Sequence, residues 1–309
     1  MMKTITKVAQ IGLGALSAFT APALQKTLGE NFYVIAGGER GERIRKNGMI
    51  VNGEQQHFHV CAPEDGEPVD LILLTVKYHQ LEQALKDIEK FVGEDTILLP
   101  LLNGVESEEA CAAVYGWEKV LYGLCQVSIV LKDGCATFNP KAATLRFGEK
   151  DNRELSERVQ AVAALLEAAG IPYEVPADML RAQWMKFMYN VSQNQSSALL
   201  GIPFGAWQVS DHANAVREMG MREVIAVAQA MGINLSEEDI APHRAYLMKV
   251  AYGNKTSMLQ DIEAGRPTEV DQLAGTMVRL GKQYGVPTPV NAFYYHAIRV
   301  LEEKNDGKI

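Results

Sequence analysis

Two glycines, Gly12 and Gly14, stand between an apolar run typical of a strand and an apolar run with helical spacing. Gly12 permits a tight turn, and Gly14 allows backbone N–H groups to approach a pyrophosphate at the positive end of the following helix. Such a turn follows the first strand of dinucleotide-binding units, so it predicts a parallel sheet that binds its ligand at the carboxyl ends of the strands. The residues that we expect to contact the dinucleotide in this turn are Gly12, Leu13, Gly14, Ala15 and Leu16.

Two positions near this turn make the fingerprint irregular. A third glycine usually allows close packing of the helix on the strand, and Ser17 takes its place here. The ribose is read at the end of the second strand, where the chain has Gly37, Gly38, Glu39 and Arg40. A carboxylate there favours the free 2′-hydroxyl of NAD, whereas an arginine favours the 2′-phosphate of NADP. Glu39 therefore predicts NAD, whereas Arg40 predicts NADP.

In the first half of the chain, short strand-like runs alternate with helical patterns. This alternation predicts a parallel sheet covered by helices. The later runs are closely spaced, which is typical of an antiparallel extension. The strand-like runs are Lys7–Ile11, Phe32–Ala36, Leu71–Val76 and Thr96–Leu99, then Val120–Ile129, Cys135–Pro140 and Thr144–Gly148, and the helical patterns include Gln80–Phe91 and Asn152–Ala169.

Beyond Pro176 the sequence has nearly continuous helical periodicity. Pro172 and Pro176 stiffen the connection, so the domain boundary is expected near Tyr173 to Ala177. We predict an α/β chain: an N-terminal Rossmann-like doubly wound sheet in residues 1–175, which binds the dinucleotide, and an all-helical C-terminal domain in residues 176–309, which binds the substrate. The helical patterns are Asp178–Leu200, Asn214–Met231, Ser236–Val250, Ser257–Ala264, Glu269–Tyr284 and Pro289–Glu303.

The composition excludes several classes of protein. With 47% apolar and 22% charged residues, the chain is typical of globular proteins rather than disordered or fibrous ones. A net charge of -8 without a basic cluster disfavours nucleic acid as a partner. The cysteines are too far apart for a CxxC redox or zinc motif, so we expect reduced thiols in a cytosolic protein. They are Cys61, Cys111, Cys125 and Cys135.

Two histidines, His57 and His59, would face the same side of a strand and could in principle chelate a metal. Two histidines without a third ligand nearby are more often surface residues. We therefore predict that the chain has no metal site.

The N-terminal residues imitate a secretory signal, because Lys3 and Lys7 precede an apolar stretch that ends near Ala21-Pro22-Ala23. The same residues form the predicted strand, turn and helix, and their removal would leave the strand Phe32–Ala36 without its partner. No other run is apolar and long enough to cross a membrane. We therefore expect a cytoplasmic protein that retains this segment and has no membrane partner.

Two polar residues follow the third and fourth predicted strands, at the edge where doubly wound sheets bind ligands. Lys77 is expected to contact a ligand there, although a solvated loop lysine is the simpler interpretation. Asn103 would lie beside the nicotinamide, and a plain Asn-Gly turn is the equally weighted alternative.

Lys186, Asn190 and Asn194 are spaced four residues apart among large apolar neighbours. That spacing keeps them on one face of an α-helix, and asparagine is unfavourable in helix interiors, so we expect a polar stripe facing a cleft. Reduction of a ketone needs a proton donor at the carbonyl oxygen, and a partly desolvated lysine can serve. Glu269 follows a Gly-Arg-Pro break, where it is either a first-turn acid or a carboxylate that points into the cleft.

Several of these motifs, in this order, resemble the ketopantoate reductase (2-dehydropantoate 2-reductase) family. The resemblance covers nearly the whole chain and is looser between Ser107 and Val175. The segments that carry it are Val76–Gln80, Leu102–Gly104, Trp184–Asn194 and Thr256–Gly275.

This resemblance implies NADPH-dependent reduction of ketopantoate to pantoate, for pantothenate and coenzyme A synthesis. It implies Lys186 as the general acid at the 2-oxo group of the substrate, with Asn103 orienting the substrate and the nicotinamide. Glu269 would anchor the substrate hydroxyl, and Lys77 would lie near the cofactor. The other polar residues of the implied pocket are Asn190, Asn194 and Ser257.

The sequence departs from the family at two places that concern the cofactor. The family often has glycine or alanine where Ser17 stands, and usually an arginine for the 2′-phosphate at the place of Gly37. NADPH preference therefore depends on Arg40 or Arg43 taking over that contact, and NADH stays open as the cofactor.

Two alternatives to ketopantoate reduction follow from the same residues. One is a related reductase that acts on another 2-oxo acid. The other is a dinucleotide sensor without chemistry, against which the presence of both Lys186 and Glu269 speaks. We expect a small-molecule 2-oxo acid as the partner and leave a homodimer open.

Overall fold

The first apolar run forms strand β1 (Val8–Ile11), which is buried along its whole length. In the residues that the structure describes, 4–132 and 134–309, β1 lies at the centre of a sheet with the strand order β5-β2-β1-β6-β7. All of its pairings are parallel, so the predicted doubly wound sheet is confirmed in this computed structural model. The other strands are β2 (Phe32–Ile35), β5 (Val60–Cys61), β6 (Val69–Leu74) and β7 (Val92–Pro100).

The register of this sheet brings four strand ends into one row. Ile11, the last residue of β1, pairs with Ile35 of β2 and with Leu74 of β6, and Leu74 pairs with Pro100 of β7. Because the strands are parallel, the loops that leave these four residues start at the same edge. Neighbouring strands lie ~4.8 Å apart, so the row spans ~15 Å.

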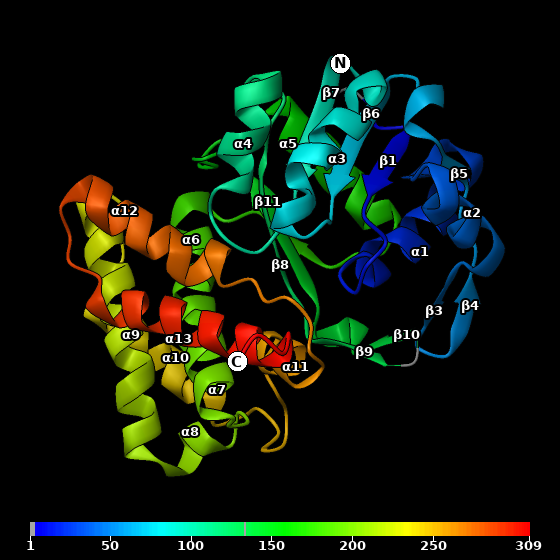
Figure 1. The fold of residues 1–309 in the computed structure, drawn as a ribbon. Helices are drawn as coiled ribbons and strands as arrows, with labels where there is room; N and C mark the ends of the chain where they lie inside the picture. Colours follow the sequence, from blue (N-terminus) through cyan, green and yellow to red (C-terminus); the bar gives the residue numbers. More distant parts are fainter. Residues whose placement is uncertain (1–3, 133) are drawn as a thin grey trace. The chain divides into compact units, whose positions relative to one another are not determined.

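Helices bury both faces of the sheet because alternate strand residues point to opposite sides. Val8 and Leu71 belong to a core that α1 and α5 complete, whereas Ala9 and Ile72 belong to a second core that α3 and α4 complete. This arrangement gives the three layers of the first unit (Figure 1). The helices are α1 (Ser17–Leu28), α2 (Gly38–Asn47), α3 (Leu81–Asp87), α4 (Ser107–Tyr115) and α5 (Glu157–Ala168), with short 3-10 turns Gly29–Asn31, Pro63–Asp65, Tyr78–Gln80, Glu89–Phe91 and Pro140–Ala142.

The later strands form two smaller sheets rather than a single extension of the first. The antiparallel pairings that the sequence predicted are present between β8 and β11 and between β9 and β10. One sheet has the order β12-β11-β8 and the other β4-β3-β10-β9. These strands are β3 (Met49–Val51), β4 (Glu54–Gln56), β8 (Tyr122–Gln126), β9 (Ile129–Lys132), β10 (Cys135–Phe138), β11 (Thr144–Gly148) and β12 (Tyr173–Glu174).

The hairpin of β3 and β4 was not predicted, although its Asn52-Gly53 turn is a typical hairpin signal. The prediction that His57 and His59 share a strand face is wrong, because both follow the end of β4 and lie outside any strand. Both are exposed, and the His59 ring packs edge-on against Tyr33 at 5.0 Å. Among the described residues, no group of three or more His, Cys, Asp or Glu side chains could hold a metal ion.

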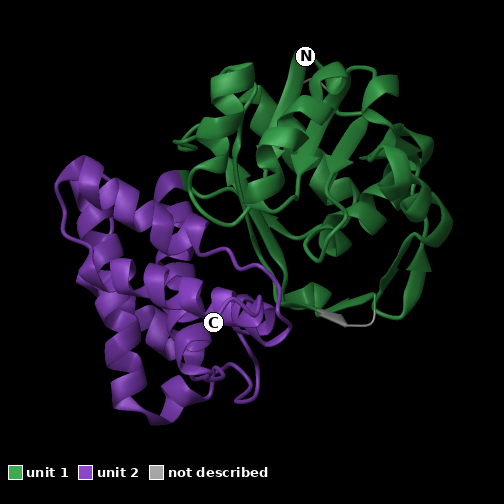
Figure 2. Cartoon of the chain, in the orientation of Figure 1, with its two compact units in different colours: residues 1–179 green, residues 180–309 purple. Residues whose placement is uncertain are grey.

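Residues 180–309, all of which the structure describes, contain helices and turns but no strand, and they form the second compact unit (Figure 2). The first unit comprises residues 1–179, so this division lies four residues beyond the 175/176 boundary expected from the sequence. None of the described helices is both long enough and apolar enough to cross a membrane. The helices are α6 (Met179–Tyr189), α7 (Gln195–Leu200), α8 (Ala206–Val209), α9 (Asp211–Ala230), α10 (Ile240–Leu247), α11 (Ser257–Glu263), α12 (Thr276–Tyr284) and α13 (Pro289–Asn305).

Two segments of the second unit are π-helical, η6 (Asn190–Asn194) and η8 (Asp271–Gly275). Segment η6 joins α6 to α7 without a break in the helix, and η8 runs directly into α12. Helices α9, α11 and α13 pack around α7, and η6 and η8 pack on each other. The two π-helical segments therefore belong to the core of this unit.

Candidate active site

The glycine turn follows β1 at the centre of the sheet edge. Gly12 has φ +93°, and a Cβ atom there would lie 2.8 Å from the backbone carbon and oxygen of Thr75. At Gly14 the same construction meets nothing within 4 Å, so this position faces open space. The two glycines therefore differ, because the fold requires a glycine at position 12, whereas a side chain at position 14 would meet no other part of the chain.

Ser17, which replaces the usual third glycine, is the first residue of α1 and is completely buried. Its hydroxyl donates to the carbonyl oxygen of Gly14 at 2.5 Å. The serine side chain thus ties the glycine turn to the start of the helix, and the departure from the family pattern is accommodated locally.

A buried polar network, which the sequence analysis did not identify, supports the turn. The Gln10 amide donates to Thr75 Oγ1 at 3.0 Å and accepts from Thr20 Oγ1 at 3.0 Å. Thr75 Oγ1 lies 2.7 Å from the Gly12 carbonyl oxygen, to which it donates. These contacts join β1, α1 and β6 beneath the turn. The available signal was a glutamine inside an otherwise apolar strand.

Replacing Gln10 by leucine is expected to lower the free energy of unfolding by ~1–3 kcal/mol, because the change leaves buried hydroxyl groups without their partner. Urea denaturation monitored by circular dichroism measures this effect. Gln83→Leu on α3 is the matched control, since Gln83 is exposed and its side chain bonds to Asp87 on its own helix. A Gln10→Leu protein as stable as the control would show that the network does not support the turn.

The residues that we expect to contact the ribose after β2 lie on α2. Glu39 and Arg40 lie in the first turn of this helix and are exposed, as is Arg43. A Cβ atom at Gly37 would lie 3.1 Å from the Pro63 ring and 3.8 Å from a Glu64 carboxylate oxygen. A larger side chain at Gly37 therefore has to fit past Pro63. The sequence analysis missed Glu64, which adds a negative charge beside this strand end.

Lys77 and Asn103 leave the same sheet edge as Gly12. Lys77 follows β6 and Asn103 follows β7, each three residues after the strand end, and both are half-buried. The Lys77 amide N–H donates to Gln80 Oε1 at 3.4 Å, and Gly104 has φ +104°, which makes the turn after Asn103 sharp. The first unit thus brings the glycine turn, Lys77 and Asn103 together at one edge.

In the second unit, the predicted polar residues lie on two successive segments, α6 and η6. Lys186 lies in α6 and is half-buried, as is Asn190, whereas Asn194 is only 6% exposed. The predicted continuous α-helix is wrong at residues 190–194, which form a π-helical turn with the wider i→i+5 hydrogen-bond pattern. The π-helical turn rotates Asn194 away from the position that an α-helix would give it.

Side chains satisfy the carbonyl groups around this π-helical turn. Ser192 Oγ donates to the Met188 carbonyl oxygen at 2.8 Å, and Gln195 Nε2 donates to that of Val191 at 2.7 Å. Gln195 Oε1 in turn accepts from the backbone N–H of Ala274 in η8 at 3.0 Å. One glutamine therefore links the two π-helical segments. Single π-helical turns within helices are frequent at functional sites.

Ser257 and Glu269 lie on segments that pack against this pair. Ser257 is the exposed first residue of α11, which packs against α7 and η6, and the preceding Thr256 caps the helix by accepting from the Leu259 N–H at 3.3 Å. Glu269 is half-buried and stands just before η8. The second unit thus holds five of the predicted pocket residues on η6, on the helix that enters it, on α11, which packs on η6, and just before η8, which also packs on η6.

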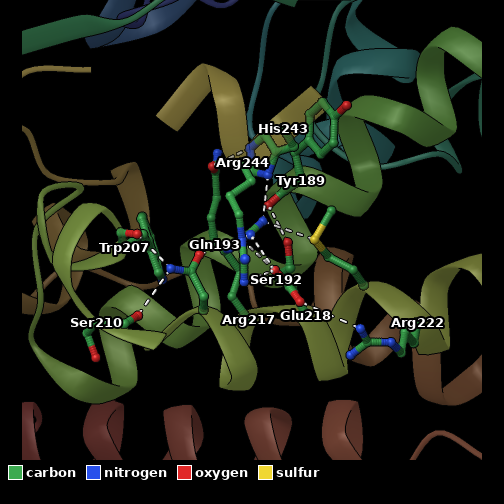
Figure 3. A network of polar contacts seen from close by, with 12 residues as sticks. Tyr189, Ser192, Gln193, Trp207, Ser210, Arg217, Glu218, Arg222, His243 and Arg244 are labelled. Carbon is green, nitrogen blue, oxygen red and sulfur yellow. Dashed lines mark hydrogen bonds and ion pairs between the residues drawn. The ribbon is translucent and has the colours of Figure 1, made fainter. Parts of the chain in front are cut away.

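A buried cation beside η6 was not predicted from the sequence (Figure 3). Arg217 on α9 is fully buried, and its Nη1 donates to His243 Nδ1 at 2.7 Å. Because this ring nitrogen accepts, the other one carries the hydrogen and donates to Gln193 Oε1 at 3.1 Å. The His243 ring also stacks on Tyr189, with centroids 3.9 Å apart. The network therefore contacts the helix just beyond Lys186.

Glu218 balances the charge of Arg217, whose Nη2 lies 3.2 Å from its carboxylate. The same carboxylate pairs with Arg244 at 2.9 Å and with Arg222 at 3.6 Å (Figure 3). Burial lowers the pKa of Arg217 to about 10, so the guanidinium stays protonated at neutral pH. No sequence pattern pairs Arg217 with His243, which is 26 residues away.

The titration of His243 predicts a loss of stability in acid. Burial and, second, the Arg217 guanidinium lower the pKa of His243 to about 3. The unfolded chain binds this proton near pH 6.5, so the free energy of unfolding falls as the pH decreases from 6.5 towards 3, by at most ~1.4 kcal/mol per pH unit. Urea denaturation at pH 7 and pH 5 measures this. His243→Gln is expected to reduce the difference in the free energy of unfolding between pH 7 and pH 5. His212→Gln, at an exposed histidine, is the control. An equal difference in both variants would contradict the assignment.

Two family models match the chain: "Ketopantoate reductase PanE/ApbA" over residues 8–152 and "Ketopantoate reductase PanE/ApbA C terminal" over residues 178–302. The 2-dehydropantoate 2-reductase of Vibrio cholerae is 31% identical over 76% of this chain and 78% of its own.

Two solved structures have the same architecture. The crystal structure of 2-dehydropantoate 2-reductase from Geobacter metallireducens is 28% identical and has a TM-score of 0.83, over 96% of this chain and 99% of its own. D-Mandelate dehydrogenase, solved with NADH and anilino(oxo)acetate, shares the fold with a TM-score of 0.86 at 24% identity, over 97% of this chain and 99% of its own. The chain therefore belongs to the ketopantoate reductase PanE/ApbA family and is an oxidoreductase that uses a nicotinamide dinucleotide.

Proposed function

We propose that the chain reduces the 2-oxo group of ketopantoate with NADPH and releases pantoate. One observation carries this proposal. Lys186, a proton donor, stands on the helix that enters η6, and Glu269, a hydroxyl-binding carboxylate, stands just before η8. The two π-helical segments are hydrogen-bonded to each other through Gln195. A proton donor and a substrate anchor thus stand on connected segments of one unit.

The first unit fits a dinucleotide. The open space at Gly14 and the positive N-terminal end of α1 suit a pyrophosphate, which Gly12, Leu13, Ala15 and Leu16 would surround. When bound, the cofactor supplies the hydride for the carbonyl carbon. In this proposal residues 1–175 hold the cofactor and residues 176–309 hold the substrate.

Each polar residue has a distinct role in the proposed reaction. Lys186 Nζ donates a hydrogen bond to the 2-oxo group and then its proton, because negative charge develops on that oxygen during reduction. Asn103 orients the substrate and the nicotinamide, with Lys77 near the cofactor. Glu269 accepts a hydrogen bond from the substrate hydroxyl. The pocket is completed by Asn190, Asn194 and Ser257.

We assign the proposed preference for NADPH to Arg40 and Arg43, two exposed arginines on α2, the helix that follows β2. Replacing both by alanine is expected to raise the KM for NADPH at least about tenfold, which corresponds to a loss of ~1.4 kcal/mol in binding. The KM for NADH should stay unchanged, since NADH lacks the 2′-phosphate. Steady-state kinetics with both cofactors checks this, and an equal change in both KM values would contradict the assignment.

A second candidate is the reduction of another 2-oxo acid with NADH. Glu39 and Glu64, two carboxylates near the end of β2, favour it because negative charge disfavours a 2′-phosphate. D-Mandelate dehydrogenase, which shares the fold, was solved with NADH. A panel of ketopantoate, 3,3-dimethyl-2-oxobutanoate and phenylglyoxylate, each with NADPH and NADH, separates the candidates. Ketopantoate should give the highest kcat/KM, and a higher value for either other acid would favour the second candidate.

A further inference from the structure

The residue before Glu269 is tied to helix α13. Glu302 Oε1 accepts from the backbone N–H of Thr268 at 2.8 Å and from its Oγ1 at 2.7 Å. Thr268 Oγ1 also accepts from the backbone N–H of Val270 at 3.3 Å. One carboxylate oxygen on α13 therefore fixes the chain directly before Glu269, and the threonine hydroxyl fixes the chain directly after it.

The residue two positions after Glu269 is tied to the same helix. Arg299 Nη2 donates to Asp271 Oδ2 at 2.5 Å, and the Tyr295 hydroxyl donates to Asp271 Oδ1 at 3.1 Å. Arg299 Nη1 donates to the second oxygen of Glu302 at 2.6 Å. Arg299 and Glu302, which we call the α13 ion pair, thus form hydrogen bonds with residues on both sides of Glu269.

Charge strengthens these contacts, and one of the three side chains, that of Glu302, is also largely buried. The Glu302 side chain is only 13% exposed, and those of Arg299 and Asp271 are 39% and 47% exposed. Burial lowers the pKa of Arg299, but its hydrogen bonds with Glu302, Tyr295 and Asp271 outweigh burial and raise the pKa above its ordinary range, so the guanidinium stays charged. Hydrogen bonds between charged groups are roughly twice as strong as neutral ones.

We propose that the α13 ion pair positions Glu269 for the substrate hydroxyl and thereby sets the preference for 2-oxo acids that carry one. This inference rests on the proposed function of Glu269. A carboxylate on a fixed backbone presents its oxygens at one place, so it forms a hydrogen bond with a hydroxyl at that place and gains no such bond from an acid that lacks the hydroxyl. Arg299 and Glu302 are positioning residues that act through Glu269.

The test compares two acids that differ by one oxygen. Ketopantoate has a terminal hydroxyl, and 3,3-dimethyl-2-oxobutanoate has a hydrogen in its place. Calorimetry on the enzyme saturated with NADP+ or NAD+, whichever gives the higher turnover, measures the dissociation constant of each acid. The ratio of the two constants is the preference for the hydroxyl.

Glu302→Ala is expected to reduce this ratio about tenfold or more, through weaker ketopantoate binding, while the affinities for 3,3-dimethyl-2-oxobutanoate and the dinucleotide stay unchanged. Glu302→Gln, which keeps an oxygen acceptor for Thr268, should restore part of the ratio. Glu303→Ala is the matched control, because Glu303 is the exposed neighbour on the same helix. If Glu302→Ala does not fold, Thr268→Val removes one of the same hydrogen bonds and should reduce the ratio in the same direction.

Glu269→Ala separates this inference from the proposed function. It should reduce the ratio by itself, and adding Glu302→Ala to it should cause no further reduction. If Glu269→Ala reduces the ratio but Glu302→Ala or Thr268→Val does not, the role of the ion pair is overturned and the proposed function stands. A reduction of both affinities alike, together with a lower melting temperature, makes the ion pair merely structural and also overturns the inference. A ratio unaffected by Glu269→Ala overturns the role of Glu269 itself.

Discussion

Lys186→Ala is expected to lower kcat for the reduction of ketopantoate by ~10²–10⁴-fold, which is the usual contribution of a positioned acid. The reason is that the substrate oxygen loses its proton donor while the rest of the pocket stays in place. The dissociation constant of the cofactor should not change, because the glycine turn that is proposed to bind it belongs to the first unit. Steady-state kinetics and a cofactor titration measure the two quantities.

The control for this variant is Lys249→Ala, which removes an exposed lysine of the same unit. It should retain the wild-type kcat. If Lys186→Ala turns over as fast as Lys249→Ala, Lys186 is not the general acid. A Lys186→Ala enzyme whose KM rises while kcat is unchanged would instead make Lys186 a binding residue.

Gly12→Ala is expected to impair folding, and Gly14→Ala is expected to impair cofactor binding without affecting folding. An alanine at position 12 must adopt φ +93° and approach the Thr75 backbone to 2.8 Å, so the free energy of unfolding should fall by about 2–5 kcal/mol. An alanine at position 14 meets nothing within 4 Å and should leave the melting temperature of the cofactor-free protein unchanged. It should raise the dissociation constant of the cofactor about tenfold or more, since its methyl group takes space proposed for the pyrophosphate.

Thermal denaturation without cofactor and fluorescence titration with it measure the two effects, and each variant serves as the control for the other. A stable Gly12→Ala protein would contradict the steric role of Gly12. A Gly14→Ala protein that binds the cofactor as tightly as the wild type would place the pyrophosphate elsewhere.

The main sheet was predictable because its determinants are local in the sequence. The apolar strands β1 and β6 are buried on both faces, and the glycine turn marks the strand at which the chain begins to wind. Once these strands are parallel, Gly12, Lys77 and Asn103 must leave the same edge, so their grouping within the first unit followed from strand order alone.

The π-helical turns were not predictable, because tertiary contacts select them. Between Lys186 and Asn194 the sequence has ordinary four-residue spacing, and the wider turn depends on Gln195, whose amide also bonds to Ala274, 79 residues away. Gln10 and Thr75, which also contact each other, are likewise far apart in sequence, at 65 residues. Polar pairs of this kind have no periodic pattern, so sequence reasoning identified the segments of the site but not what holds them in place.

The central claim is tested most directly by steady-state kinetics of the purified protein with ketopantoate, using NADPH and NADH in parallel, and by identification of the product. The account predicts ketopantoate-dependent oxidation of NADPH with a kcat/KM of about 10⁴ M⁻¹s⁻¹ or higher, a lower value with NADH, and pantoate as the product. Tight binding of the dinucleotide without turnover of ketopantoate would contradict it.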